Sequence, residues 1–173
     1  MSRAVITEVA PQATLTFSTL LPDEGATLAV AGRMACALPS AVAPLILYLH
    51  GDLGAGKTTL ARGLLRALGE SGPVRSPTFG LLAEYALPAG TVLHLDLYRL
   101  RAANELAGLG LADYLPGSRL WLVEWPERAG GAGLPAADVE AWLELAGNGR
   151  SLRLVAGSLL GAQWLTALNA DDA

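Results

Sequence analysis

The chain has little of several things that whole classes of protein need. It has 173 residues and a single cysteine, Cys36, so it cannot form an internal disulfide. The segment Met1–Pro11 lacks the basic flank and the continuous apolar stretch of a signal peptide. No apolar run approaches the roughly 18 residues of a membrane span, and Leu45–Leu49 has only the length of a strand. These absences favour a soluble cytoplasmic protein with no membrane association.

Charge is also scarce. Charged residues make up 16% of the chain, against about a quarter in average domains. The net charge of −4 argues against a broad nucleic-acid-binding face, and the thin surface charge favours a protein partner. A hydrophobic content of 52% excludes a disordered protein. At this length we expect one domain over residues 14–170, preceded by a flexible N-terminus at residues 1–13.

The apolar patterning predicts an α/β domain. The expected strands are Thr14–Ser18, Leu45–Leu49, Phe79–Tyr85, Thr91–Asp96 and Arg119–Glu124. Two further strands, one before and one after the turn at 147–149, are expected to form an antiparallel pair. The expected helices are Ala26–Leu38, Lys57–Leu68, Ala102–Ala107 and Leu159–Leu168. Buried strands joined by crossover helices, followed by an antiparallel pair, indicate a mixed sheet with a parallel core, antiparallel additions and flanking helices.

A glycine-rich segment joins the apolar strand to the helix that starts at Lys57. Its residues, GDLGAGKT at 51–58, fit the P-loop pattern G-x-x-x-x-G-K-[ST]. The glycines let successive backbone N–H groups converge on phosphate oxygens, where a Cβ would obstruct them. Lys57 then supplies an ammonium to the β- and γ-phosphates, and Thr58 a hydroxyl to Mg²⁺. The motif lies at a strand-to-helix junction, the context it requires, so the sequence predicts a nucleotide-binding site.

A P-loop also needs a carboxylate at the end of a nearby strand, to hold Mg²⁺ or to orient the attacking water. The apolar strand LWLVE ends in Glu124, and VLHLD ends in Asp96. Strand ends in open α/β sheets face the ligand crevice, so both acids are candidates. Strand alternation places His94 on a strand face, and we interpret it as structural.

Lysine is the rarest basic residue. Of the 12 basic side chains, 11 are arginine and one, Lys57, is lysine. Guanine-specific P-loop GTPases usually read the base with an Asn-Lys-x-Asp motif. That motif cannot exist here because the P-loop already uses the single lysine, so the composition favours ATP over GTP.

These segments resemble the TsaE (YjeE) family of small bacterial P-loop ATPases. The resemblance covers most of the chain, from about Pro22 to Arg153, and extends beyond the P-loop to three more specific motifs. The motifs are SPTF at 76–79, HLDLYR at 94–99 and VEWPE at 123–127.

The resemblance implies roles for individual residues. The phosphate-binding residues would be Gly54, Ala55, Gly56, Lys57, Thr58 and Thr59, and the metal would be held by Thr58 and Glu124. Asp96 would be a catalytic or water-positioning carboxylate, and Thr78 a switch residue that senses the γ-phosphate. The candidate catalytic residues are therefore Lys57, Thr78, Asp96 and Glu124.

Two further positions match the family near the outer edge of the nucleotide. They are Glu24, in the segment PDE, and Arg150, after the turn at 147–149. A helix N-terminal acid and a solvated hairpin arginine are equally good interpretations of these two side chains.

The resemblance also implies a function and partners. The chain would bind and weakly hydrolyse ATP with Mg²⁺ in the bacterial machinery that forms N6-threonylcarbamoyladenosine at position 37 of tRNAs reading ANN codons. Its partners would be TsaD, which transfers the threonylcarbamoyl group, and TsaB, a non-catalytic relative of TsaD. The tRNA would be met only indirectly, through these partners, which agrees with the acidic net charge.

Two alternatives stay open. A P-loop small-molecule kinase would suit the length, but it usually has an arginine-rich lid, and the nearest arginine pair is Arg99 and Arg101. A nucleotide-dependent adaptor with negligible hydrolysis of its own overlaps with the ATPase interpretation.

Overall fold

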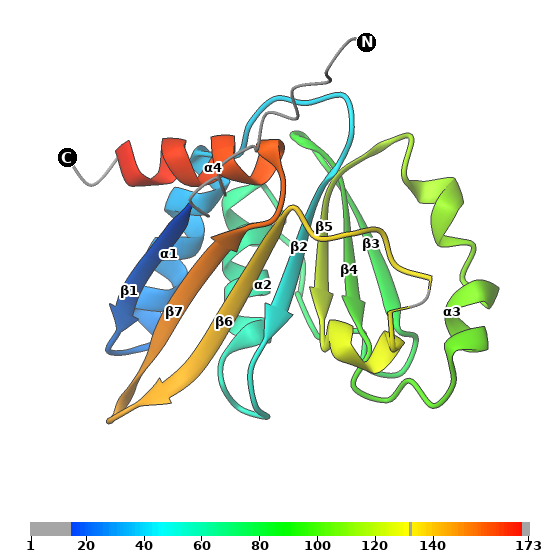
Figure 1. The fold of residues 1–173 in the computed structure, drawn as a ribbon, viewed down its shortest axis with the longest axis horizontal. Helices are drawn as coiled ribbons and strands as arrows, with labels where there is room; N and C mark the ends of the chain where they lie inside the picture. Colours follow the sequence, from blue (N-terminus) through cyan, green and yellow to red (C-terminus); the bar gives the residue numbers. More distant parts are fainter. Residues whose placement is uncertain (1–14, 132, 171–173) are drawn as a thin grey trace, which may run out of the picture.

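The fold is an α/β arrangement around a single mixed sheet, seen in a computed structural model (Figure 1). The structure describes residues 15–131 and 133–170, so the N-terminal segment 1–13, expected to be flexible, lies outside the described residues. The strands are β1 (Thr16–Leu21), β2 (Leu45–His50), β3 (Leu82–Leu87), β4 (Gly90–Asp96), β5 (Ser118–Glu124), β6 (Val139–Ala146) and β7 (Gly149–Ala156). The helices are α1 (Glu24–Cys36), α2 (Lys57–Ala67), α3 (Ala103–Gly108) and α4 (Leu159–Ala170), with short 3₁₀ turns η1 (Leu111–Tyr114) and η2 (Pro126–Ala129).

The strand order confirms the predicted mixed sheet. The order is β1-β7-β6-β2-β5-β4-β3. The four central strands β6, β2, β5 and β4 run parallel to one another. On one side β7 runs antiparallel to both of its neighbours, β6 and β1, and on the other side β3 runs antiparallel to β4. The carboxyl ends of all the parallel strands therefore lie at one edge of the sheet, where ligands bind in open α/β folds.

Both faces of the central strands are buried, which explains their continuous apolar runs. In β5, Leu120 and Leu122 join the core that α1, α2 and α4 cover, whereas Trp121 and Val123 join a second core with residues of α3, η1 and η2. Among the described residues, this second core contains none from β1, β6 or β7. That end of the sheet therefore has one face covered by helices and one face open.

The predicted strand at Phe79–Tyr85 starts too early. Residues 78–80 form a turn instead, and strand β3 begins at Leu82. The backbone N–H of Leu81 donates to the carbonyl oxygen of Pro77 at 2.7 Å, and Leu81 has a φ of 61°. A left-handed residue ends extended pairing, so the apolar Phe79 projects into solvent rather than into a sheet.

Other predicted elements have the right type with shifted bounds. The first strand is β1, which pairs with β7 from Thr16 to Leu21 rather than spanning Thr14–Ser18. Helix α1 starts at Glu24 instead of Ala26, because the Asp23 carboxylate accepts from the backbone N–H of Ala26 at 2.8 Å and caps the helix.

No helix in the part of the chain that the structure describes has both the length and the apolar character needed to cross a membrane.

Gly161 of α4 offers a direct test of this packing. A Cβ at this position would overlap the carbonyl oxygen of Asp138, whereas a Cβ at Gly32 of α1 would meet nothing within 4 Å. We expect Gly161→Ala to lower the free energy of unfolding by about 1–3 kcal/mol through overpacking. We expect Gly32→Ala to raise it by about 0.5–1 kcal/mol, the helix propensity difference. Urea denaturation measures both, and equal effects of the two variants would contradict the packing of α4 on β6.

Candidate nucleotide-binding site

Three neighbouring parallel strands bring the predicted site residues together. Glu124 ends β5 and is paired in register with Asp96 at the end of β4 and with Leu49 of β2. The P-loop begins directly after β2, at Gly51. The sheet therefore places both candidate carboxylates and the P-loop side by side, although Asp96 and Glu124 are 28 positions apart in the sequence.

The P-loop has the backbone that its glycines make possible. Gly51, Gly54 and Gly56 have φ values of 134°, 81° and 105°, in a region that L side chains rarely adopt. A Cβ on Gly51 would also overlap the carbonyl oxygen of Leu143 in β6. The loop therefore needs glycine at three positions for its backbone conformation, and at Gly51 also for its close packing against β6.

Lys57 is the first residue of α2, directly after the loop, and is 5% exposed. Its Nζ donates to the carbonyl oxygens of Gly51 at 2.6 Å and Asp52 at 2.9 Å. The same ammonium lies 3.7 Å from the centre of the Trp125 ring, within the range of a cation–π contact. Burial lowers the pKa of Lys57, and the neighbouring carboxylates, Glu124 first, oppose that change.

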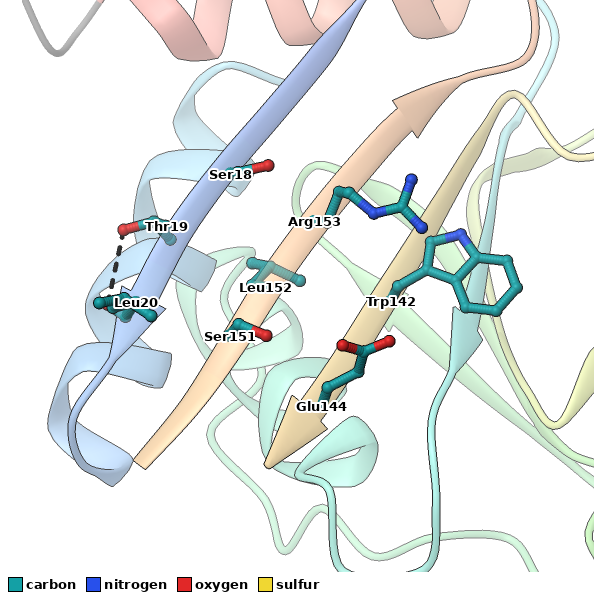
Figure 2. Close-up of a pocket in the computed structure, with 8 residues that line it drawn as sticks. All are labelled: Ser18, Thr19, Leu20, Trp142, Glu144, Ser151, Leu152 and Arg153. Carbon is teal, nitrogen blue, oxygen red and sulfur yellow. Dashed lines mark hydrogen bonds between the residues drawn. The ribbon is translucent and has the colours of Figure 1, made fainter. Parts of the chain in front are cut away.

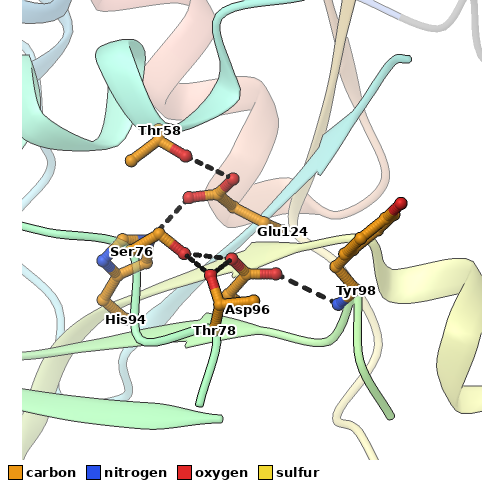
Figure 3. A network of polar contacts seen from close by, with 7 residues as sticks. All are labelled: Thr58, Ser76, Thr78, His94, Asp96, Tyr98 and Glu124. Carbon is orange, nitrogen blue, oxygen red and sulfur yellow. Dashed lines mark hydrogen bonds and ion pairs between the residues drawn. The ribbon is translucent and has the colours of Figure 1, made fainter. Parts of the chain in front are cut away.

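Glu124 is 2% exposed and has a partner at each carboxylate oxygen. Oε2 accepts from the Thr58 hydroxyl at 2.8 Å, and Oε1 lies 2.8 Å from Nε2 of His94 (Figure 3). The P-loop threonine and the β5 carboxylate thus form a pair of neighbouring oxygens, the two that the family resemblance implies for a metal site.

Asp96 is the centre of a second group of contacts (Figure 3). Its Oδ2 accepts from the Thr78 hydroxyl at 2.8 Å and from the Ser76 hydroxyl, and the two hydroxyls lie 2.6 Å apart. Oδ1 accepts from the backbone N–H of Tyr98 at 3.0 Å. The segment between α2 and β3 is therefore connected to the carboxyl end of β4 through Asp96.

These groups surround one hollow of about 400 Å³. It is lined by Leu53, Gly54, Gly56, Lys57, Thr58, Thr59, Ser76, Thr78, Asp96, Tyr98, Arg99, Glu124, Trp125 and Arg150. All four candidate catalytic residues are in this set, and so is the proposed metal pair.

The other predicted nucleotide-binding residues differ in their position relative to the hollow. Arg150 is the second residue of β7 and lies beside the P-loop, where its Nη2 donates to the carbonyl oxygen of Gly54 at 3.3 Å. Ala55 is 1% exposed and belongs to the core, so only its backbone is available to a ligand on this side. Glu24 does not line the hollow. Its carboxylate pairs with Arg62 of α2, and its side chain is 64% exposed.

Comparisons with known proteins identify the family of this chain. Residues 21–152 match the family model described as threonylcarbamoyl adenosine biosynthesis protein TsaE. Over 125 residues the chain is 40% identical to the tRNA threonylcarbamoyladenosine biosynthesis protein TsaE of Haemophilus influenzae, covering 72% of this chain and 78% of that one. The chain belongs to the TsaE family.

Other relatives extend the match. The protein of the same name from Synechocystis is 44% identical over 112 residues, 62% of this chain and 69% of that one. The crystal structure of Bacillus subtilis YdiB has a TM-score of 0.77 to this structure at 27% identity, covering 94% of this chain and 99% of that chain. The fold is therefore the P-loop NTPase-like fold, and the TsaE family is one of tRNA threonylcarbamoyladenosine biosynthesis.

The interpretation of His94 as purely structural omitted a contact of the TsaE site. His94 is fully buried, and its ring touches Glu124 rather than packing only against apolar neighbours. Ser76 was likewise missed as a partner of Asp96. A signal for His94 was present, because it lies two residues before Asp96 and therefore on the same face of β4. No periodicity connects Ser76 to Asp96, since Ser76 lies in an irregular segment.

A second hollow, of about 470 Å³, lies on the open face of β1, β7 and β6 (Figure 2). It is lined by Ser18, Thr19, Leu20, Trp142, Glu144, Ser151, Leu152 and Arg153. None of the residues that we predict for the nucleotide site is among them.

His50, which precedes the P-loop, stacks on Trp142 at 4.1 Å between ring centres. Burial lowers the pKa of His50, and the nearby carboxylates of Glu140 and Glu127 oppose that change.

Proposed function

We propose that this chain is the Mg²⁺-dependent ATPase of the tRNA threonylcarbamoyladenosine machinery, acting with TsaD and TsaB. The observation that carries the proposal is the meeting of the P-loop, with Lys57 and Thr58, and two buried strand-end carboxylates around one hollow. The pathway is inferred from family membership. The reaction is inferred from the residues that line the hollow.

The residues fit a magnesium nucleotide. Mg²⁺ prefers oxygen ligands and is usually held by one or two carboxylates together with substrate phosphates. Thr58 Oγ1 and Glu124 Oε2 are such oxygens, 2.8 Å apart at the start of α2. They would hold the ion, which when bound neutralises charge on the β- and γ-phosphates.

Lys57 would bind the phosphates themselves. Its ammonium donates to two loop carbonyls. A phosphate oxygen would replace these neutral acceptors with charged ones, so that the ammonium would pair with an anion. The P-loop backbone N–H groups and the amino end of α2 would add further donors.

Asp96 and Thr78 would act where the γ-phosphate reacts. Three donors, from Ser76, Thr78 and Tyr98, orient the Asp96 carboxylate at the wall of the hollow. In this position it can accept a hydrogen bond from the attacking water. A γ-phosphate that draws the Thr78 hydroxyl away from Asp96 would move the segment before β3, which is how a nucleotide-sensing switch works.

The partners follow from family and charge. With a net charge of −4 the chain is poorly suited to grip tRNA directly. TsaD and TsaB would therefore carry the tRNA contact, and ATP hydrolysis here would drive a conformational step in the complex.

The decisive experiment is a measurement of phosphate release with and without TsaD, TsaB and tRNA. We expect weak hydrolysis by the isolated chain and clear stimulation by the full set, with no phosphorylated small molecule formed. Transfer of the γ-phosphate to a metabolite would instead identify a kinase. Full tRNA modification with a non-hydrolysable ATP analogue would instead identify an adaptor.

A further inference from the structure

We propose that His94 is a positioning residue for Glu124. Its ring N–H would hold one carboxylate oxygen so that the other faces Thr58 and the metal. This inference rests on the proposed Mg²⁺ site and adds a residue to which no role in that site is assigned.

The geometry forms a short linear chain of groups (Figure 3). Nε2 of His94 lies 2.8 Å from Glu124 Oε1, and Glu124 Oε2 lies 2.8 Å from the Thr58 hydroxyl. His94 is 0% exposed and Glu124 2% exposed, so water does not compete for either contact. The imidazole therefore determines which way the carboxylate plane can turn.

The sheet makes His94 a rigid support. Its backbone in β4 pairs with Leu122 of β5 on one side and with Ala83 of β3 on the other. His94 is thus diagonal to Glu124 on the same face of the sheet, within reach of a long side chain. A group held between two strands can fix a neighbour more closely than a loop residue can.

The polarity of the contact follows from its chemistry. An ionised carboxylate only accepts hydrogen bonds, so the ring proton that meets Glu124 is on Nε2. Nδ1 of His94 has no hydrogen-bond partner among the described residues. Within the described part of the chain, the polar contact of the ring is therefore made with Glu124.

His94 acts through Glu124 rather than on the nucleotide. It does not line the hollow, and Glu124 lies between the ring and Thr58 of the P-loop. Without the ring N–H, Oε1 would be a buried acceptor with no donor, and the carboxylate would turn toward another cation such as Lys57. Loss of this kind of outer contact typically weakens metal binding about 10–100-fold.

The test compares three variants by equilibrium binding of ATP, once in EDTA and once across a Mg²⁺ titration. His94→Leu removes the donor, His94→Gln places an amide nitrogen near the position of Nε2, and His94→Asn leaves it nearer to Nδ1. We expect His94→Leu to raise the Mg²⁺ concentration for half-saturation about tenfold or more, with ATP affinity in EDTA changed less than twofold. We expect His94→Gln to restore most of the metal affinity, and His94→Asn little of it.

A metal-free readout covers the case in which His94→Leu does not fold. The chain has two histidines, so in the His50→Gln variant His94 carries the single imidazole ring. The ¹⁵N and ¹H NMR signals of this imidazole identify which of its nitrogens is protonated. We expect a slowly exchanging proton on Nε2, and a faster exchange in the Glu124→Ala background. A proton on Nδ1, or equal metal affinity in the wild type and a folded His94→Leu, would overturn the positioning role alone. A wild type whose ATP binding ignores Mg²⁺ would overturn the proposed function, and this inference with it.

Discussion

Replacing Lys57 with alanine should lower the proposed ATP hydrolysis by about 10²–10³-fold, the usual loss when a charge-stabilising donor is removed from a transition state. Lys57 is the chain's one lysine, and its ammonium is held at the mouth of the P-loop by the carbonyls of Gly51 and Asp52. ATP-dependent tRNA modification by the reconstituted system should fall with it. Phosphate release and the modified nucleoside, measured by mass spectrometry, check the two effects.

Two controls separate the charge from its geometry. Lys57→Arg keeps the charge, but a planar guanidinium fits poorly into a loop that surrounds a compact ammonium, so we expect little rescue. Arg66→Ala removes an arginine from the last turn of the same helix, where it contacts the carbonyl of Glu70, and should leave hydrolysis unchanged. Circular dichroism on heating reports whether each variant is folded. A folded Lys57→Ala protein that hydrolyses ATP and modifies tRNA at normal rates would refute the role of Lys57.

The second large effect is expected for Glu124. In Glu124→Ala the Thr58 hydroxyl loses its carboxylate partner. The site also loses the one negatively charged side chain that we propose as a ligand of the metal. We expect the Mg²⁺ concentration needed for half-maximal ATP binding to rise at least about tenfold, on the scale of lost metal-site contacts. Titration of Mg²⁺ and of Mn²⁺ against bound nucleotide measures this shift.

Asp96→Asn is the matched control, because Asp96 is the register neighbour of Glu124 on β4. The amide keeps the shape, and its oxygen can still accept from Thr78, but it lacks the charge. We expect kcat to fall while the Mg²⁺ requirement stays near that of the wild type. The opposite pattern, an unchanged metal requirement in Glu124→Ala and a raised one in Asp96→Asn, would assign the metal to Asp96.

Local chemistry explains why much of the fold could be predicted from the chain. The predicted strands Leu45–Leu49 and Arg119–Glu124 contain continuous apolar runs, at 45–49 and 120–123, that are typical of strands buried on both faces, and the structure confirms them as β2 and β5. The predicted boundaries of strands and helices were wrong where a tertiary contact or a turn decides where the element begins. Strand β3 begins at Leu82 because a turn at 78–80 and the left-handed Leu81 precede it.

The site divides in the same way. The sequence by itself determined the P-loop, its single lysine and the two acids that end apolar strands, because each is a short motif with its own chemistry. Only the tertiary structure decided which groups meet: Thr58 and His94 at Glu124, Ser76 and Thr78 at Asp96, and Trp125 over Lys57. Strand order and register bring these pairs together across tens of residues, and neither can be calculated from the spacing of residues within any one segment.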